Sequence, residues 1–204
     1  MQQLEYFKAK KILDDYGIKN IESKYVNDAK DAQTFCGNDK IVLKAISEKA
    51  LHKSKAGLVM LDISSGEVSK AYSELVKRAK KIKPYKIIAQ KMSKKGIEII
   101  LGGRYDDQFG RLILIGLGGI YVETFKDFSL RVCPINAYDA SEMLKQLKSI
   151  NVITYNGKTT KLLENLLLKI SKLLIDHPEI KELDLNPAII SENDYEIVDI
   201  RMLL

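Results

Sequence analysis

The sequence predicts a mixed α+β protein of two lobes, and three patterns lead to this prediction. Short runs of β-branched and other apolar residues recur along the chain, separated by turn residues. Segments with apolar residues at helical spacing interrupt these runs. Glycines gather between residues 96 and 131, where they stand at the ends of β-branched runs. Strand pairs joined by short turns and interrupted by helices indicate a mixed sheet with helices packed on it. We expect lobes at 1–90 and 91–204, with a hinge near 90–96.

The first lobe is expected to begin with an amphipathic helix, which Gly17 ends as a typical C-terminal cap. A polar connector follows. The later helix of this lobe has the cleanest helical pattern in the chain, and Pro84 closes it. The expected elements are a helix at 3–16, strands at 41–46 and 57–63, and a helix at 68–82.

The second lobe is expected to be a glycine-rich sheet followed by helices. The loop GLGG at 116–119 can let backbone amides approach an anion, or adopt positive φ without Cβ strain. Glycine loops are common, so this pattern alone is weak. The expected elements are strands at 97–101, 112–115, 120–122 and 195–200, and helices at 136–149 and 159–176, while the strand at 85–91 lies at the end of the first lobe.

Composition and length fit a soluble globular protein. The 204 residues are 46% hydrophobic and 29% charged, which is ordinary for a chain that buries a core. No apolar run approaches the roughly 20 residues of a membrane span, and the N-terminus has no apolar signal region. The two cysteines, Cys36 and Cys133, have no metal-type spacing and are expected to be reduced thiols. We therefore expect a cytoplasmic protein with no membrane partner.

The net charge of +6 raises nucleic acid as a partner. The lysines, however, are spread among 27 acidic residues, and the one dense basic block is KRAKKIK at 77–83. This block ends a predicted helix, where cations complement the helix dipole. Aromatic residues do not interleave with it in the sequence. We therefore expect a solvated helix end and no nucleic-acid partner.

Lys44 and Glu98 are charged residues within predicted apolar strands, and each has two interpretations. Lysine is rarely buried without a partner, so Lys44 either faces water from an edge strand or points into a site that holds anions. Glu98 either occupies the wet face of an alternating strand or belongs to a binding site. The residues alone leave both alternatives open.

The histidines and the C-terminal oxygen donors are the other candidates. By itself His52 is a surface loop histidine, and His177 is interpreted as structural at a helix end. Asp184, Asn186 and Asp199 supply oxygen donors on two neighbouring segments, although Asn186 could simply lie in a turn. Mg²⁺ takes one or two protein oxygens and completes its octahedron with phosphate and water. Such a sparse donor set therefore fits a magnesium site.

Specific motifs occur at QFG (108–110), GLGGIYVE (116–123), KD (126–127) with Arg131, ELDLNP (182–187) and VDIR (198–201). Together and in this order they resemble the ATP-grasp domain of ADP-forming acyl-CoA synthetases, most closely the β subunit of ADP-forming acetate–CoA ligase. The resemblance covers nearly the whole chain. It implies a single ATP-grasp domain at 1–204, whose two α+β lobes clasp a nucleotide.

The resemblance also implies nucleotide-binding roles, with ATP or ADP as the ligand. Lys44 is similar to the family's strand lysine that contacts nucleotide phosphates. Gln90 and Met92 belong to a segment that resembles the hinge strand whose backbone recognises adenine. Glu98 resembles the acid that holds the ribose hydroxyls.

The resemblance further implies a metal and a phosphoryl relay. Asn186 and Asp199 are similar to the family's Mg²⁺ ligands. His52, which precedes a lysine, matches the histidine that the family is thought to phosphorylate as a second carrier. A partner α subunit, in an α2β2 hetero-oligomer, would convert acyl-CoA and phosphate to acyl phosphate and capture the phosphoryl group. The group would then reach ADP in this chain by way of His52.

Two alternatives belong to other classes of subunit. A non-catalytic ATP-grasp scaffold would keep the fold and bind ADP without transferring a phosphoryl group. Leu58 after Gly57, and Asn156 before Gly157, depart from the family pattern and favour this alternative weakly. A succinyl-CoA synthetase β-like ligase shares the ATP-grasp core but continues into a further C-terminal domain.

Overall fold

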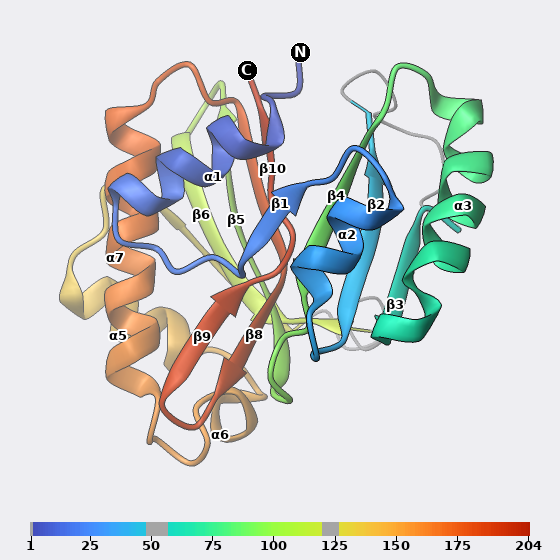
Figure 1. Ribbon diagram of the computed structural model, residues 1–204. Helices are drawn as coiled ribbons and strands as arrows, with labels where there is room; N and C mark the ends of the chain where they lie inside the picture. The colour runs from blue at the N-terminus through green and yellow to red at the C-terminus, as the bar shows by residue number, and fades with distance from the viewer. Residues whose placement is uncertain (1, 48–56, 120–126) are drawn as a thin grey trace. The chain divides into compact units, whose positions relative to one another are not determined.

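The computed structural model describes residues 2–47, 57–119 and 127–204 (Figure 1). The chain forms two compact units. The larger unit contains residues 1–20 and 94–204, and the smaller unit contains residues 21–93. The boundary between residues 93 and 94 lies inside the hinge expected at 90–96. The boundary between residues 20 and 21 lies inside the lobe predicted at 1–90, so the N-terminal helix belongs with the C-terminal half.

Pairing with the last strand places the N-terminal segment in the larger unit. The Leu4 amide donates a hydrogen bond of 2.9 Å to the Met202 carbonyl. Helix α1 (Tyr6–Asp15) then buries Ala9 and Leu13. These contacts join residues that are far apart in the sequence. The local pattern of apolar residues therefore could not predict that α1 belongs to the larger unit.

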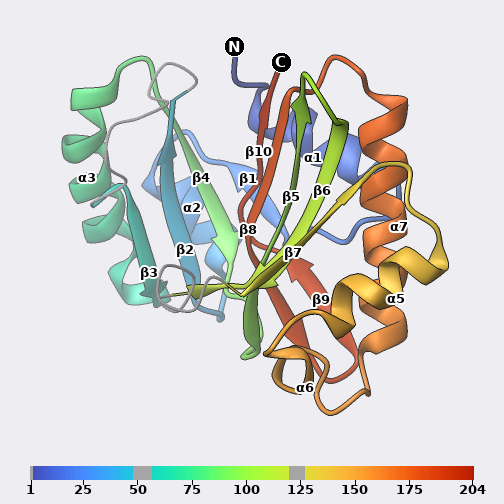
Figure 2. The ribbon, with the colours of Figure 1, turned by 180° about the vertical axis from the view of Figure 1, so that it is seen from behind.

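The smaller unit is an antiparallel sheet of four strands in the order β1-β4-β2-β3, with helices α2 and α3 packed on it (Figures 1 and 2). Leu43 and Leu75 are fully buried in the core between the sheet and these helices. The elements are β1 (Ser23–Tyr25), α2 (Ala29–Cys36), β2 (Ile41–Ile46), β3 (Val59–Ile63), α3 (Val68–Ala79) and β4 (Lys86–Lys91), with short 3₁₀ helices at Ser65–Glu67 and Lys80–Ile82.

Helix α2 lies where the sequence predicted only a polar connector. It buries Ala32 and Cys36, which are one turn apart. Asp28 caps it, because its carboxylate accepts a hydrogen bond of 2.7 Å from the Asp31 amide. Two buried side chains in one short helix give too weak a period to predict it. Packing against α3 and the sheet therefore supports this helix.

The larger unit has a six-stranded antiparallel sheet, in which β10-β8-β5-β6-β7 are neighbours and β9 pairs with β8. Helix α7 packs against β6 and helix α5 against β7 (Figure 2). The strands are β5 (Ile97–Asp106), β6 (Gly110–Leu117), β7 (Phe128–Val132), β8 (Glu182–Ser191), β9 (Asp194–Ile197) and β10 (Arg201–Leu203). Besides α1, the helices are α5 (Ala137–Lys145), α6 (Ile150–Ile153) and α7 (Thr160–Asp176).

The two faces of this larger sheet differ. A Cβ on Gly103 would lie 2.4 Å from Cδ1 of Leu174, so this residue faces α7. Because strand side chains alternate, Gly102 and its cross-strand neighbours Leu114 and Asp184 lie on the opposite face. That opposite face carries the groove described below.

The predicted α+β class is confirmed. The strand at 41–46 coincides with β2, and the helix at 159–176 begins one residue early. The strand predicted at 120–122 lies outside the described residues. The segment around Asn186, which could have been a turn, lies inside β8. No helix in the described part of the chain has the length and hydropathy needed to cross a membrane.

Candidate functional site

Lys44 lies on an interior strand of the smaller unit. Strand β2 runs between β3 and β4, and Lys44 is opposite Val59 on one side and Ile88 on the other. The residue is only 8% exposed. The alternative in which Lys44 faces water from an edge strand is therefore wrong. A buried ammonium group requires compensating charge or hydrogen bonds, and an anionic ligand is one source of both.

Gln90 shares a face of the sheet with Lys44. Leu43 and Ala89, their neighbours along the two adjacent strands, belong to the core under the helices. By alternation, Lys44 and Gln90 lie on the other face. Gln90 is fully buried, whereas Met92, just beyond β4, is 39% exposed. The structure thus brings the phosphate candidate and the first hinge candidate onto one surface of the smaller unit.

The structure describes one of the two histidines. His52 lies outside the described residues. His177 follows α7, where its Nδ1 is 2.8 Å from Oε1 of Glu179 and its ring contacts that of Tyr16 edge-on. These contacts agree with the structural interpretation of His177.

Glu98 lies at the start of β5, directly beside the glycine loop. The Gly118 amide donates a hydrogen bond of 2.8 Å to the Glu98 carbonyl. A Cβ on Gly118 would lie 2.8 Å from the Glu98 carbonyl carbon, and a Cβ on Gly119 would lie 3.1 Å from the Glu98 carboxylate. Gly119 also has a φ of 70°. Gly118 cannot carry a side chain without displacing the Glu98 backbone, and the positive φ of Gly119 favours glycine there. Glu98 itself is exposed.

Asn186 and Asp199 are brought together through Pro187. The Pro187 carbonyl accepts hydrogen bonds from the amides of Val198 (3.0 Å) and Asp199 (3.4 Å). Asn186 is exposed, and Asp199 is half-buried just before β10. Two segments that are separate in the sequence therefore present their oxygen donors from one region of the larger unit.

The chemistry of these donors suits Mg²⁺. An amide oxygen from Asn186 and a carboxylate from Asp199 are hard ligands, and Asp184 lies two residues from Asn186 on the same strand. Among the described residues, no group of three or more His, Cys, Asp or Glu side chains could hold a metal. One amide oxygen and one carboxylate suit Mg²⁺, which keeps several ligands from water and phosphate.

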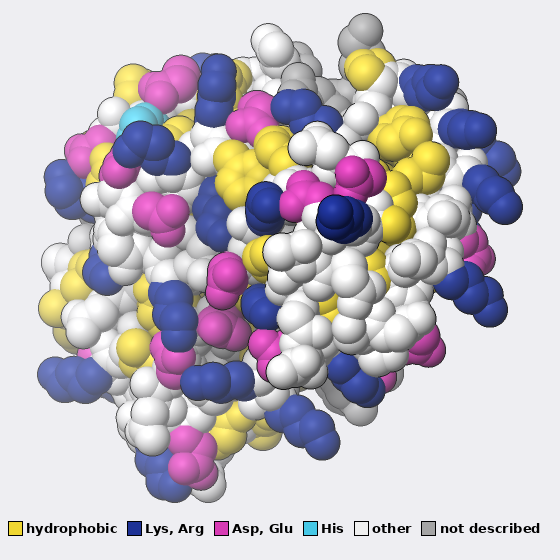
Figure 3. Space-filling model, in the orientation of Figure 1, with side chains coloured by type: hydrophobic (Ala, Val, Ile, Leu, Met, Phe, Trp, Pro, Cys, Tyr) yellow, Lys and Arg dark blue, Asp and Glu magenta, His cyan; other side chains and the backbone are white. Residues whose placement is uncertain are grey.

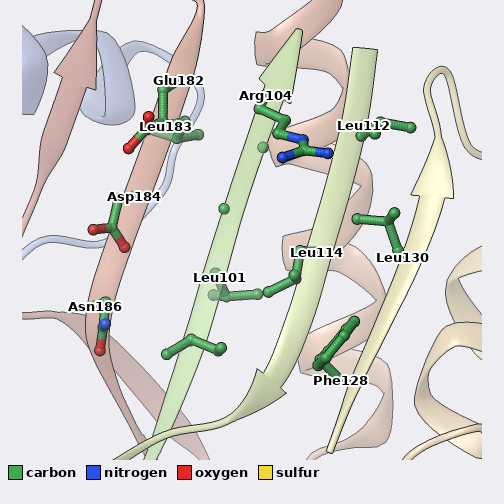
Figure 4. A pocket seen from close by; sticks show the side chains of 13 residues that line it. Leu101, Arg104, Leu112, Leu114, Phe128, Leu130, Glu182, Leu183, Asp184 and Asn186 are labelled. Carbon is green, nitrogen blue, oxygen red and sulfur yellow. The ribbon is translucent and has the colours of Figure 1, made fainter. Parts of the chain in front are cut away.

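A groove of about 510 Å³ lies on the face of the larger sheet opposite α7. Asp184 and Asn186 of β8 line one side, and Leu114 and Phe128 line the other (Figure 4). Arg104 extends from β5 along the same face (Figure 4). The volume is typical of small-molecule sites. Sequence reasoning missed Arg104, Leu114 and Phe128, although strand alternation would have placed them on the face of Asp184 once the register was known.

Asp127, from the KD motif, has a structural role. Its carboxylate accepts hydrogen bonds of 2.8 Å each from the amides of Lys148 and Ser149. Burial by itself would raise the pKa of Asp127, but the hydrogen bonds from Ser149 and Lys148 outweigh it and lower the pKa. The carboxylate fixes the turn before α6 to the start of β7.

Comparisons with known proteins agree with this architecture. The family model described as an ATP-grasp domain matches residues 1–204. The β subunit of acetate–CoA ligase [ADP-forming] I from Pyrococcus furiosus is 36% identical over 207 residues, which cover 96% of this chain and 89% of that subunit. The acetate–CoA ligase [ADP-forming] I of Archaeoglobus fulgidus is also 36% identical, and the match covers 95% of this chain and 30% of that protein.

A solved structure gives the same result. The dinucleotide-forming acetyl-coenzyme A synthetase 1 of Ca. Korarchaeum cryptofilum, in complex with coenzyme A, Ca-AMPCP and HgCl⁺, is 32% identical with a TM-score of 0.89. The match covers 100% of this chain and 93% of that one. The same synthetase with Mg-AMPPCP, its phosphohistidine segment pointing towards the nucleotide binding site, has a TM-score of 0.83 and 31% identity over 99% of this chain and 92% of that one. The chain therefore belongs to the ATP-grasp family, a nucleotide-binding fold, and within it to the group of ADP-forming acetate–CoA ligase β subunits.

Proposed function

We propose that this chain is the nucleotide-binding β subunit of an ADP-forming acyl-CoA ligase, and that it makes ATP from ADP with an α subunit in an α2β2 assembly. The observation that carries the proposal is the match to the Pyrococcus furiosus β subunit over 89% of that protein's length. Lys44, Glu98, Asn186 and Asp199 are all present where the family's motif expects nucleotide and metal contacts.

The proposed overall reaction is acyl-CoA + ADP + phosphate = acid + ATP + CoA. A phosphate oxygen first attacks the thioester carbonyl in the α subunit, and the C–S bond breaks to release CoA and leave an acyl phosphate. A histidine nitrogen of the α subunit then attacks phosphorus, and the carboxylate of the acid leaves. The phosphoryl group next moves from nitrogen to nitrogen when His52 acts as the second carrier. Finally a terminal oxygen of ADP attacks phosphorus, the P–N bond breaks, and ATP and free histidine result.

The residues of this chain would bind and orient the nucleotide. The Lys44 ammonium would neutralise phosphate oxygens from an interior strand, where the low dielectric strengthens its charge. The Glu98 carboxylate would accept hydrogen bonds from the ribose hydroxyls, and the backbone of Gln90 to Met92 would recognise adenine. Asn186 would hold Mg²⁺ together with Asp199. When bound, the metal would supply charge neutralisation at the transferring phosphoryl group.

The test is ATP formation from acetyl-CoA, phosphate, ADP and Mg²⁺ by this chain mixed with its candidate α subunit. Activity that needs both subunits and fails in both Lys44→Ala and His52→Ala would support the full relay. Loss in Lys44→Ala alone would keep nucleotide binding and remove His52 as a carrier. Tight Mg²⁺-dependent ADP binding without activity on any acyl-CoA would instead support a non-catalytic subunit.

A further inference from the structure

A second groove, of about 590 Å³, lies wholly within the smaller unit. Three tyrosines line it, one from each element that meets there: Tyr25 at the end of β1, Tyr72 on α3 and Tyr85 just before β4. We call it the tyrosine groove. Neither the nucleotide candidates nor the metal candidates line it, so the proposed function does not account for it.

Backbone pairing and helix spacing build the tyrosine groove. The Val26 amide donates a hydrogen bond of 3.0 Å to the Ile87 carbonyl, which holds the end of β1 beside the start of β4. Tyr72 and Val76 lie one turn apart on α3 and form the facing wall. Lys86 Nζ lies 4.7 Å from the centroid of the Tyr25 ring, a cation–π contact at the rim.

The tyrosine side chains keep hydrogen-bonding capacity. Tyr72 and Tyr85 are only half-buried. Within the described part of the chain, neither of their hydroxyls has a hydrogen-bond partner. Burial first, and then the nearby Asp28 carboxylate, raise the pKa of Tyr72, so its hydroxyl remains a neutral donor. The groove thus offers ring surface together with donors for a polar ligand.

A row of lysines adjoins the groove at the C-terminal end of α3. Lys80 follows Val76 by one turn, and Lys83 precedes Tyr85 by two residues. No carboxylate of the described residues pairs with the exposed lysines of this row, Lys77, Lys80, Lys81 and Lys83. Figure 3 shows hydrophobic side chains beside a line of Lys and Arg side chains over the upper right of the molecule, where Figure 1 places this end of α3.

The acidic residues at the other rim are already engaged. The Asp31 carboxylate pairs with Lys24 at 2.5 Å and accepts a hydrogen bond from the Asn27 amide. Asp28 caps α2. Asp28 keeps its negative charge, but the four lysines of the row outweigh it, so the net charge beside the groove is positive and a polyanion with flat aromatic groups complements it.

We propose that the tyrosine groove binds single-stranded nucleic acid, with bases stacked on Tyr72 and Tyr85 and phosphates along Lys77, Lys80 and Lys83. Aromatic platforms beside a positively charged track are the general means of binding single strands without sequence readout. The sequence argued against this partner because no aromatic residue interleaves with the basic block. In the folded chain, Tyr25 and Tyr72 are distant in the sequence but line one groove near the basic block, so aromatic rings do lie beside the lysines.

The experiment uses the full chain and fluorescently labelled oligouridine and oligothymidine of about 12 nucleotides, a length within the usual site sizes. Fluorescence anisotropy gives the affinity between about 50 and 200 mM salt. We expect Tyr72→Ala and Tyr85→Ala each to weaken binding roughly 5- to 150-fold, the range for loss of one base stack. Tyr72→Phe keeps the ring and should weaken binding far less. Comparison of the two oligonucleotides tells RNA from DNA.

Lysine variants separate the groove from general attraction to a basic protein. Lys80→Gln and Lys83→Gln, made singly, should each reduce the slope of log affinity against log salt by roughly 0.7, the value for one lost phosphate contact. Lys161→Gln, an exposed lysine on α7 in the other unit, is the matched control and should change the slope less. Saturating Mg-ADP should leave oligonucleotide binding unchanged, because the nucleotide candidates do not line the tyrosine groove. Loss of oligonucleotide binding and loss of ligase activity are therefore separate outcomes.

Three results would overturn the proposal. One is the absence of binding at low salt. Another is equal weakening by Lys161→Gln and the groove lysine variants with no effect of either tyrosine variant, since net charge alone then explains binding. The last is displacement by polyglutamate as effectively as by unlabelled oligonucleotide, which would assign the groove to an acidic peptide. Circular dichroism checks that each variant folds, and Tyr85→Ala serves if Tyr72→Ala does not.

Discussion

At the scale of single residues, the burial of the Lys44 charge is unfavourable for stability and indicates a binding role. Its place on the interior strand β2, at 8% exposure, removes most of the water that would solvate an ammonium group. The effective cost of desolvating a charge in a protein is several kcal/mol, on the order of 2–5. An anionic ligand would offset part of that cost, in addition to the interaction that Lys44 makes within the chain.

Lys44→Met keeps an unbranched side chain, one atom shorter than that of lysine, and removes the charge. The unfolding temperature without nucleotide is the reference, and we expect it to fall, because Lys44 also interacts within the chain and its loss leaves that partner unsatisfied. The rise on adding Mg-ADP, worth about 2.7 kcal/mol at a hundred times Kd, should disappear. Differential scanning fluorimetry measures both, with the exposed Lys30→Met as control. Wild-type stabilisation by Mg-ADP in Lys44→Met would exclude the phosphate role.

Gly118→Ala tests the close approach of the glycine loop to Glu98. The added Cβ would lie 2.8 Å from the Glu98 carbonyl carbon, which neither backbone can accommodate without moving. We expect a loss of about 1–3 kcal/mol in urea unfolding and weaker ADP binding, because Glu98 is displaced. Gly66→Ala is the control, since nothing lies within 4 Å of its added Cβ. Equal effects of the two substitutions would contradict this account.

At the scale of elements, the turn before α6 depends on a carboxylate that comes from the edge of the sheet. Asp127 accepts two backbone hydrogen bonds there, from Lys148 and Ser149. Helix α6 is a single turn, and it is too short to be stable by itself. Its position is therefore set by tertiary contacts, which the sequence analysis did not foresee.

Asp127→Asn should lower the free energy of unfolding by about 1–3 kcal/mol near neutral pH, the cost of a poorly satisfied buried group. The pKa of Asp127 is lowered in the folded state, so its contribution is complete above the unfolded-state pKa of about 3.9. This contribution is lost as pH falls through the folded-state pKa. The difference between wild type and variant should therefore shrink below about pH 4 in urea unfolding series. A difference that stays constant down to pH 2 would contradict the assignment.

At the scale of the whole molecule, the chain leaves the larger unit after residue 20 and returns at residue 94. The two ends of the chain are adjacent, because Gln2 and Leu204 exchange two backbone hydrogen bonds of 3.1 and 2.9 Å. The first and last segments of the chain are therefore paired with each other within the larger unit. The smaller unit has a continuous sequence and a core of its own.

Removal of residues 1–17 should expose β10 and leave the smaller sheet protected. The deletion removes the Leu4 pairing and the buried Ala9 and Leu13, so we expect amide exchange at Arg201–Leu203 to accelerate by at least roughly tenfold, about 1.4 kcal/mol. Exchange in β2 and β4 should change little. Hydrogen exchange followed by mass spectrometry makes the comparison, and equal acceleration in both units would show that they unfold as one.

The sequence by itself determined the α+β class, the position of β2 and α7, and the membership of the ATP-grasp family. These properties depend on the local period of apolar residues and on contiguous motifs such as ELDLNP, and both are present in the chain before it folds. Only the tertiary structure decided that Lys44 is on an interior strand, that α1 belongs to the larger unit, and that Tyr25 and Tyr72 meet beside the lysines of α3. The order of the strands, the pairing of the chain ends and the walls of the groove depend on hydrogen bonds and packing between residues that are distant in the sequence. The local pattern of apolar residues does not indicate which distant segments will meet.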